Sequence, residues 1–112
     1  MEVQVFGIRK SADTRAALRF FAERRITVHF VDCNERAPAV GELRRFAEKF
    51  GLHNLVAPGR PVATLERLSL EPLLLRMPLV RYRQQLTIGA APEVWEGWVA
   101  AAKTSGTPRP GG

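Results

Sequence analysis

The chain has 112 residues, of which 46% are hydrophobic, so it is long enough for one domain and too apolar for a disordered chain. No apolar run approaches the ~18 residues that a membrane span needs. The opening "MEVQVF" lacks the basic and apolar parts of a signal peptide, and we expect a cytoplasmic protein without a membrane partner. The single cysteine, Cys33, excludes an internal disulfide, which agrees with that compartment.

The charge is basic, with 17 Lys and Arg residues against 11 Asp and Glu residues and a formal net charge of +6. Such an excess suits an anionic partner, either a small oxyanion, a nucleic acid or an acidic protein surface. A solvated, arginine-rich surface explains the charge equally well. Binding to nucleic acid is not favoured, because no short run is dense in Lys and Arg and no known motif is present.

The first part of the chain predicts a strand, a helix and a second strand. Residues 2–6, "EVQVF", alternate polar and apolar side chains, and Gly7 closes this strand. Ser11 and Asp13 both suit the N-cap of a helix that includes "TRAALRFFAERR" (14–25). The β-branched stretch "ITVHFVD" (26–32) follows as a strand. Together they predict a βαβ unit with two parallel strands.

The middle of the chain predicts helices. An amphipathic helix ends at Gly51, "APGRP" (57–61) interrupts the chain, and residues 62–77 form one or two short helices. The apolar positions of the amphipathic helix recur at i, i+3, i+4 and i+7: Leu43, Phe46, Ala47 and Phe50.

The last part predicts a hairpin and a helix. The strands "LVRYR" and "LTIG" are joined at Gln84–Gln85, the helix begins at Pro92, and residues 104–112 form a flexible tail. Aromatic residues at helical spacings are assigned to the core, although joint exposure of the two tryptophans would instead indicate a dimer or partner surface. These residues are Phe20, Phe21, Phe46, Phe50, Trp95 and Trp98.

The order βαβ, helices, ββα is the layout of a thioredoxin-like α/β fold with a mixed sheet. We expect one domain over 1–103, its core formed by 1–37 and 78–103 and interrupted by a helical insert at 38–77. Thioredoxin-like folds place a cis-proline before the third strand, where Pro78 stands here. A trans-proline that ends a helix fits equally, and the sequence leaves this point open.

The chain resembles the arsenate reductase-like family, which includes the ArsC reductases and the Spx regulators, over about residues 2–102. "VFGIRKSADTR" and the strand after it resemble the family's opening, and "GELRRFAEKFGLHNLV" resembles its insert helix. "LLLRMPLV" and "LTIGAAPEVWEGW" resemble its proline stretch and its last strand and helix. The resemblance implies a glutaredoxin-like fold with redox chemistry at a cysteine, or, as in the regulators, contact with RNA polymerase.

The resemblance also shows what this chain lacks. The nucleophilic cysteine falls on Ser11, and the oxyanion-binding arginine before the proline falls on Met77, with Arg76 in the place of the preceding lysine. Arg60 stands near the place of a further active-site arginine of the family. Two residues that carry the chemistry are therefore missing while the framework is kept.

The residues at the expected site limit its chemistry. A serine hydroxyl is barely ionised without a neighbouring base, and neither His29 nor His53 is expected beside Ser11, which we interpret as a helix cap. Cys33 follows the second strand at the same end of the sheet. It is either a relocated nucleophile or a small apolar residue.

An anion site is predicted at the helix start, where free N–H groups lie near Arg9, Lys10 and Arg15. Phosphate, sulfate, arsenate or the carboxylates of glutathione would suit it, unless these bases are simply solvated. The candidate anion- or thiol-binding residues are Arg9, Lys10, Ser11, Arg15, Arg60 and Pro78. We expect no metal and no resident cofactor, glutathione being the molecule that the resemblance suggests.

Two functions remain. The first is a non-catalytic binding or regulatory module with a degenerate redox site, for which Arg76, Arg81 and Arg83 are candidate contacts with an acidic protein surface. The alternative is a glutathione- or glutaredoxin-dependent arsenate or thiol-disulfide reductase that uses Cys33. The loss of both the cysteine and the arginine before the proline favours the first. The sequence leaves the partner and the oligomeric state open.

Overall fold

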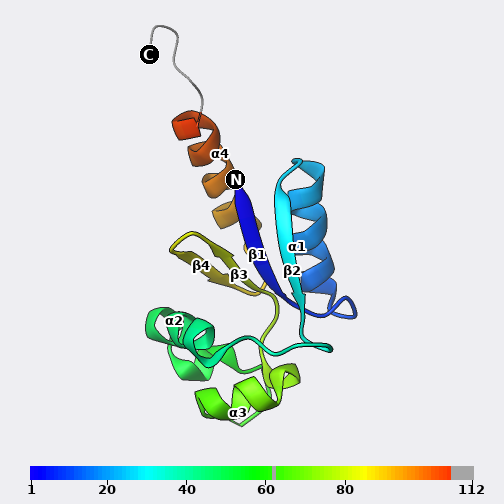
Figure 1. Ribbon diagram of the computed structural model, residues 1–112, viewed down its shortest axis with the longest axis vertical. Helices are drawn as coiled ribbons and strands as arrows, with labels where there is room; N and C mark the ends of the chain where they lie inside the picture. The colour runs from blue at the N-terminus through cyan, green and yellow to red at the C-terminus, as the bar shows by residue number, and fades with distance from the viewer. Residues whose placement is uncertain (62, 107–112) are drawn as a thin grey trace, which may run out of the picture.

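The computed structural model describes residues 1–61 and 63–106 (Figure 1). Its elements in chain order are β1 (Glu2–Gly7), α1 (Ala12–Glu23), β2 (Thr27–Asp32), α2 (Val40–Phe50), the 3-10 helix η1 (Leu52–Leu55), α3 (Leu65–Leu70), the 3-10 helix η2 (Pro72–Leu74), β3 (Leu79–Tyr82), β4 (Gln85–Ile88) and α4 (Pro92–Gly106).

The four strands form one sheet in the order β2-β1-β3-β4. β1 and β2 are parallel, as a βαβ unit requires, and β3 runs antiparallel to both β1 and β4. This is the predicted mixed sheet of a thioredoxin-like fold. Between the two halves lies the helical segment, and Figure 1 shows it gathered at one end of the molecule.

One face of the sheet is covered by α1 and α4. Because side chains alternate along a strand, Val3 and Val5 both point to this face, where they pack with Phe21 and the tryptophans. Trp95 and Trp98 are only 1% and 4% exposed, so their assignment to the core is confirmed and the condition for a tryptophan-lined partner surface is not met, while Phe20 and Phe50 are partly buried. The Trp95 indole Nε1 donates a hydrogen bond to Thr87 Oγ1 at 2.9 Å, which satisfies its buried polar atom.

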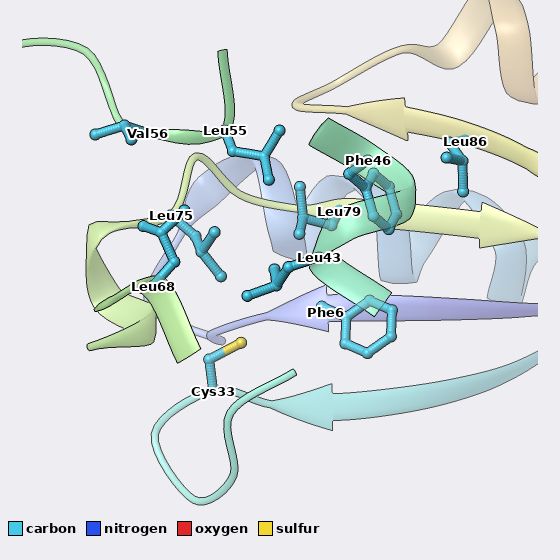
Figure 2. Packing of buried hydrophobic residues seen from close by; sticks show 10 residues of the cluster. All are labelled: Phe6, Cys33, Leu43, Phe46, Leu55, Val56, Leu68, Leu75, Leu79 and Leu86. Atoms are coloured by element: carbon cyan, nitrogen blue, oxygen red, sulfur yellow. The ribbon is translucent and has the colours of Figure 1, made fainter. Parts of the chain in front are cut away.

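The other face is covered by the helical insert (Figure 2). The middle of the insert is held to its C-terminal end by a β-bridge between Val56 and Leu75, and the Arg76 N–H donates to the Leu55 carbonyl at 2.7 Å. The start of β3 is thereby fixed against the insert. The buried side chains here are Phe6, Cys33, Leu43, Phe46, Leu55, Val56, Leu68, Leu75, Leu79 and Leu86.

Two predicted boundaries were wrong. The hairpin turns at Arg83–Gln84, one residue earlier than expected, because Tyr82 pairs with Gln85 and Arg83 takes a left-handed conformation with φ of 55°. The last helix continues to Gly106, beyond the expected start of the tail at residue 104, because the strong helix formers at 100–103 carry it onward. The remaining tail residues, 107–112, lie outside the described residues.

One or two short helices were predicted between residues 62 and 77, and the structure has two, α3 and η2. Thr64 caps α3, its Oγ1 accepting from the Arg67 N–H at 3.1 Å, and Pro72 begins η2. The open question at the next proline is also answered, since the Met77–Pro78 peptide bond is cis. Residue 62 itself lies outside the described residues.

Candidate functional site

Three candidate segments converge at one end of the sheet. The register pairs Gly7 with Asp32 in parallel and Phe6 with Leu79 in antiparallel fashion, so β1 and β2 end where β3 begins. The loop from Ile8 to Ser11, Cys33 and Pro78 all adjoin these strand ends. The prediction that Ser11 and Cys33 lie at the same end of the sheet is confirmed.

Ser11 is the N-cap of α1. Its backbone is extended, with φ of −76° and ψ of 124°, and its Oγ accepts a hydrogen bond from the Thr14 N–H at 3.2 Å. Its own N–H donates to the Ile8 carbonyl at 3.0 Å, which closes the loop. The helix-cap prediction is confirmed, and the Ser11 hydroxyl stabilises the helix start.

Gly7 and Thr14 form a contact that the sequence analysis missed. Thr14 is fully buried, and a Cβ on Gly7 would lie 2.5 Å from its Oγ1 and 2.8 Å from its Cγ2. Only glycine allows α1 to approach the end of β1 this closely. The sequence shows a glycine at the end of the first strand and a threonine in the first turn of the helix, but it gives no sign that the two residues are in contact.

The basic residues around the loop are partly engaged within the protein. Arg15 Nη1 donates to the carbonyl oxygens of Arg9 at 2.8 Å and Lys10 at 3.0 Å. The Arg9 guanidinium lies 4.8 Å from the centroid of the Phe30 ring on β2, beside a cavity of about 580 Å³. Of the three predicted bases, Arg15 therefore braces the loop, Arg9 extends toward β2, and Lys10 is exposed.

Cys33 belongs to the core. It is 4% exposed, its N–H donates to the Gly7 carbonyl at 2.8 Å, and its sulfur is turned toward the apolar cluster (Figure 2). Burial, with a smaller contribution from the Asp32 carboxylate, raises the pKa of the Cys33 thiol to about 11. The thiol is therefore protonated at neutral pH and a poor nucleophile, as expected of a small apolar core residue.

The other candidate positions, Arg60, Arg76 and Met77, belong to the insert. Arg60 and Cys33 both line a cavity next to α3 and η2, and Ser11 is not among its lining residues. Met77 packs, partly buried, against the insert cluster. Arg76 is exposed and lies over Gly89, where an added Cβ would be 3.4 Å from its Nε.

Arg81 is not a free surface cation, which corrects its assignment as a partner contact. It pairs with Glu42 of α2 and donates to the Gln4 side chain, and the Arg81 and Glu42 side chains are only 24% and 17% exposed. This ion pair joins the insert to β3. Arg83 is exposed, with its guanidinium 5.5 Å from the centroid of the Tyr82 ring.

Neither histidine is placed to activate Ser11. His29 lies on β2, three positions before its end, and its Nε2 is 2.5 Å from Glu2 Oε1, a contact that lowers the pKa of Glu2. The His53 ring lies against Gly51, at the end of α2.

Within the described residues, no group of three or more His, Cys, Asp and Glu side chains could hold a metal ion. None of the helices in that part of the chain is long and apolar enough to cross a membrane.

No family model and no curated protein matches the sequence. Solved structures do match. An arsenate reductase from Vibrio cholerae is 20% identical with a TM-score of 0.71, the match covering 84% of this chain and 94% of that one. An arsenate reductase (ArsC) related protein from Brucella melitensis is also 20% identical, with a TM-score of 0.62 and coverages of 88% and 95%.

A glutaredoxin from Archaeoglobus fulgidus is 13% identical with a TM-score of 0.50, over 87% of this chain and 84% of that one. The fold predicted from the resemblance, a thioredoxin-like fold of the arsenate reductase type, is therefore confirmed. At such low identities these likenesses establish the fold and leave the chemistry to the residues of the site.

Proposed function

We propose that this protein is a non-catalytic binding or regulatory module whose fold retains the site of a thiol reductase without its nucleophile. One observation carries the proposal: the hydroxyl of Ser11 caps α1 at the position of the family's cysteine, while the single thiol of the chain is buried in the core. Attack on a disulfide or on arsenic needs a thiolate, and neither group supplies one at neutral pH.

The loss extends beyond the nucleophile. A reductase site also holds the oxyanion of its substrate, and the partly buried Met77 offers no charge for this task. Arg76 and Arg60 are cationic, but the first lies over Gly89 and the second beside Cys33. These placements support a site that has lost its catalytic arginine as well as its cysteine.

The start of α1 supports weak binding of small anions. The N–H groups of Ala12 and Asp13 have no hydrogen-bond partner among the described residues, and Lys10 and the rest of the Arg15 guanidinium lie near them. The carboxylate of Asp13 in the same turn opposes an anion. We therefore expect millimolar, salt-sensitive binding of phosphate, sulfate, arsenate or glutathione, measured by calorimetry at low ionic strength. The absence of any heat with all four would remove this subsite.

The test of the proposal is reductase activity toward arsenate and toward a glutathione mixed disulfide, with glutathione and glutaredoxin supplied. We expect no turnover by the natural chain. The Ser11→Cys variant reports whether the loop and the start of α1 still activate a thiol. The double variant Ser11→Cys/Met77→Arg restores both the cysteine and the arginine. Turnover by the natural chain that disappears in Cys33→Ala would establish the reductase alternative and end the proposal.

A further inference from the structure

A second cavity, of about 410 Å³, lies between the end of β2 and the α3–η2 segment, apart from the Ser11 loop. Its walls combine apolar side chains with a few polar groups, as in sites that receive a ligand side chain. Its lining includes Arg60, Leu70, Glu71 and Leu73.

Two leucines at this cavity are unusually exposed. Leu70 is 83% exposed and Leu73 is 54% exposed, whereas Leu68 and Leu75 nearby are buried. The local backbone explains the difference, because α3 ends at Leu70 and Pro72 starts a new turn, which places both leucines outside the core. Large apolar side chains in water beside a cavity are typical of an interaction surface.

The charge left at the cavity is positive. Glu71 forms an exposed ion pair with Arg67, whose Nε lies 2.5 Å from Glu71 Oε2 across one helical turn. The Arg60 side chain is exposed, and its backbone N–H donates to the Ala57 carbonyl at 3.1 Å, whereas its guanidinium has no hydrogen-bond or ion-pair partner among the described residues. A ligand that covers the leucines therefore meets an uncompensated guanidinium, which favours a carboxylate beside the apolar group.

We infer that this surface docks a segment of a partner protein that inserts an apolar side chain into the cavity and places an Asp or Glu against Arg60. The inference rests on the proposed function and names the site and the chemistry of its protein partner. A small molecule inside the cavity would leave Leu70 largely in water, whereas a protein segment covers it. A lipid surface needs no cavity, so the combination of cavity, leucines and arginine favours a protein.

The inference is tested by selecting short linear peptides from a phage-displayed library on the intact protein. Selection against the variant Leu70→Ser/Leu73→Ser removes peptides that bind elsewhere. We expect enriched peptides to contain a large apolar residue flanked by Asp or Glu. Fluorescence anisotropy of one such labelled peptide should show binding weakened at least about tenfold by each leucine substitution and by Arg60→Gln.

Matched controls are available on the distant helices. Val94→Ser alters an exposed apolar side chain of α4, and Arg19→Gln removes an exposed charge from α1, so neither should change peptide affinity. Circular dichroism melts check that the variants fold, and Arg60→Gln tests the site without any change to the apolar surface.

The inference is wrong if no enriched peptide distinguishes the natural chain from the double leucine variant, or if the enriched peptides lack acidic residues. Leucine-dependent binding to anionic phospholipid vesicles without peptide binding would assign the surface to a membrane instead. Each of these results removes the docking site and leaves the absence of reductase activity, which is measured separately, untouched.

Discussion

The reactivity of Cys33 is the feature on which the loss of catalysis can be tested most quantitatively. Burial raises its pKa from 9.0 to about 11, and this difference of two pH units lowers the thiolate fraction at neutral pH about 100-fold. Because Cys33 is also only 4% exposed, access of a reagent to the sulfur is restricted. We therefore expect reaction with an aromatic disulfide reagent at least ~100-fold slower than in the urea-unfolded chain.

The assay is the pseudo-first-order rate of thiol modification from pH 6.5 to 9.5, with Ser11→Cys/Cys33→Ala as the comparison. In the natural chain the rate should rise with pH and reach no plateau in this range. A thiol at the start of α1 should react quickly at pH 7, since thiol pKa values fall to ~3.5–7.5 at helix N-termini and beside basic groups. Rapid reaction of native Cys33 with a plateau below pH 8 would refute the reasoning.

Three stability predictions follow from the same end of the sheet and from the insert. Gly7→Ala should destabilise the protein by about 1–3 kcal/mol in urea unfolding, because the added Cβ would clash with the Thr14 side chain. In a Thr14→Ala background the nearest remaining atom is the Cβ of residue 14 at 3.2 Å, and the destabilisation caused by Gly7→Ala should fall below ~1 kcal/mol. Ser11→Ala should cost ~1 kcal/mol through loss of the α1 cap. A double-mutant cycle with Glu42→Gln and Arg81→Gln should give a coupling of about 1–2 kcal/mol, above the ~0.2–1 kcal/mol of exposed pairs, since this pair is largely buried.

Gly97 supplies the control for the glycine experiment. A Cβ there would have nothing within 4 Å, and the residue lies inside α4, so Gly97→Ala should stabilise the protein by up to ~1 kcal/mol. Equal costs for Gly7→Ala with and without Thr14 would contradict the contact. A coupling near zero between Glu42 and Arg81 would show that the insert is held to β3 by apolar packing alone.

Local pattern was sufficient for the fold. The alternation of Val3 and Val5, the amphipathic run at Leu43 and Phe46, and the order of the elements are properties of neighbouring residues, and they predicted the sheet and the helices that cover it. The Ser11 cap is also local, because its acceptor and donor are three residues apart. Such features can be predicted because the residues that determine them are neighbours in the sequence.

The predictions that were missed or wrong depend on how the elements pack and pair with one another. Arg81 was assigned to a partner surface because no local signal indicates that α2 brings Glu42 beside it. The stacking of Arg9 on Phe30 and the contact of Gly7 with Thr14 likewise arise from how elements pack. The hairpin turn was misplaced by one residue because no Asn-Gly pair marks it, and cross-strand pairing decides its register.

The sequence predicted which residues lie at the same end of the sheet, but not which side chains of the insert line a cavity with them. Ser11, Cys33 and Pro78 do meet at one end of the sheet, since parallel and antiparallel pairing fix which strand ends adjoin. The position of Arg60 beside Cys33 depends on the path of the insert, which the sequence does not specify. The exposed leucines were hidden for a similar reason, since a helical pattern does not show which apolar residues the helix ends leave in water.

The measurement that tests the central claim most directly is the turnover of arsenate and of a glutathione mixed disulfide by the natural chain with glutathione and glutaredoxin present. We predict no turnover above the protein-free rate, because the capping hydroxyl of Ser11 and the buried thiol of Cys33 provide no thiolate. Turnover that scales with protein concentration and is abolished by Cys33→Ala would contradict the account.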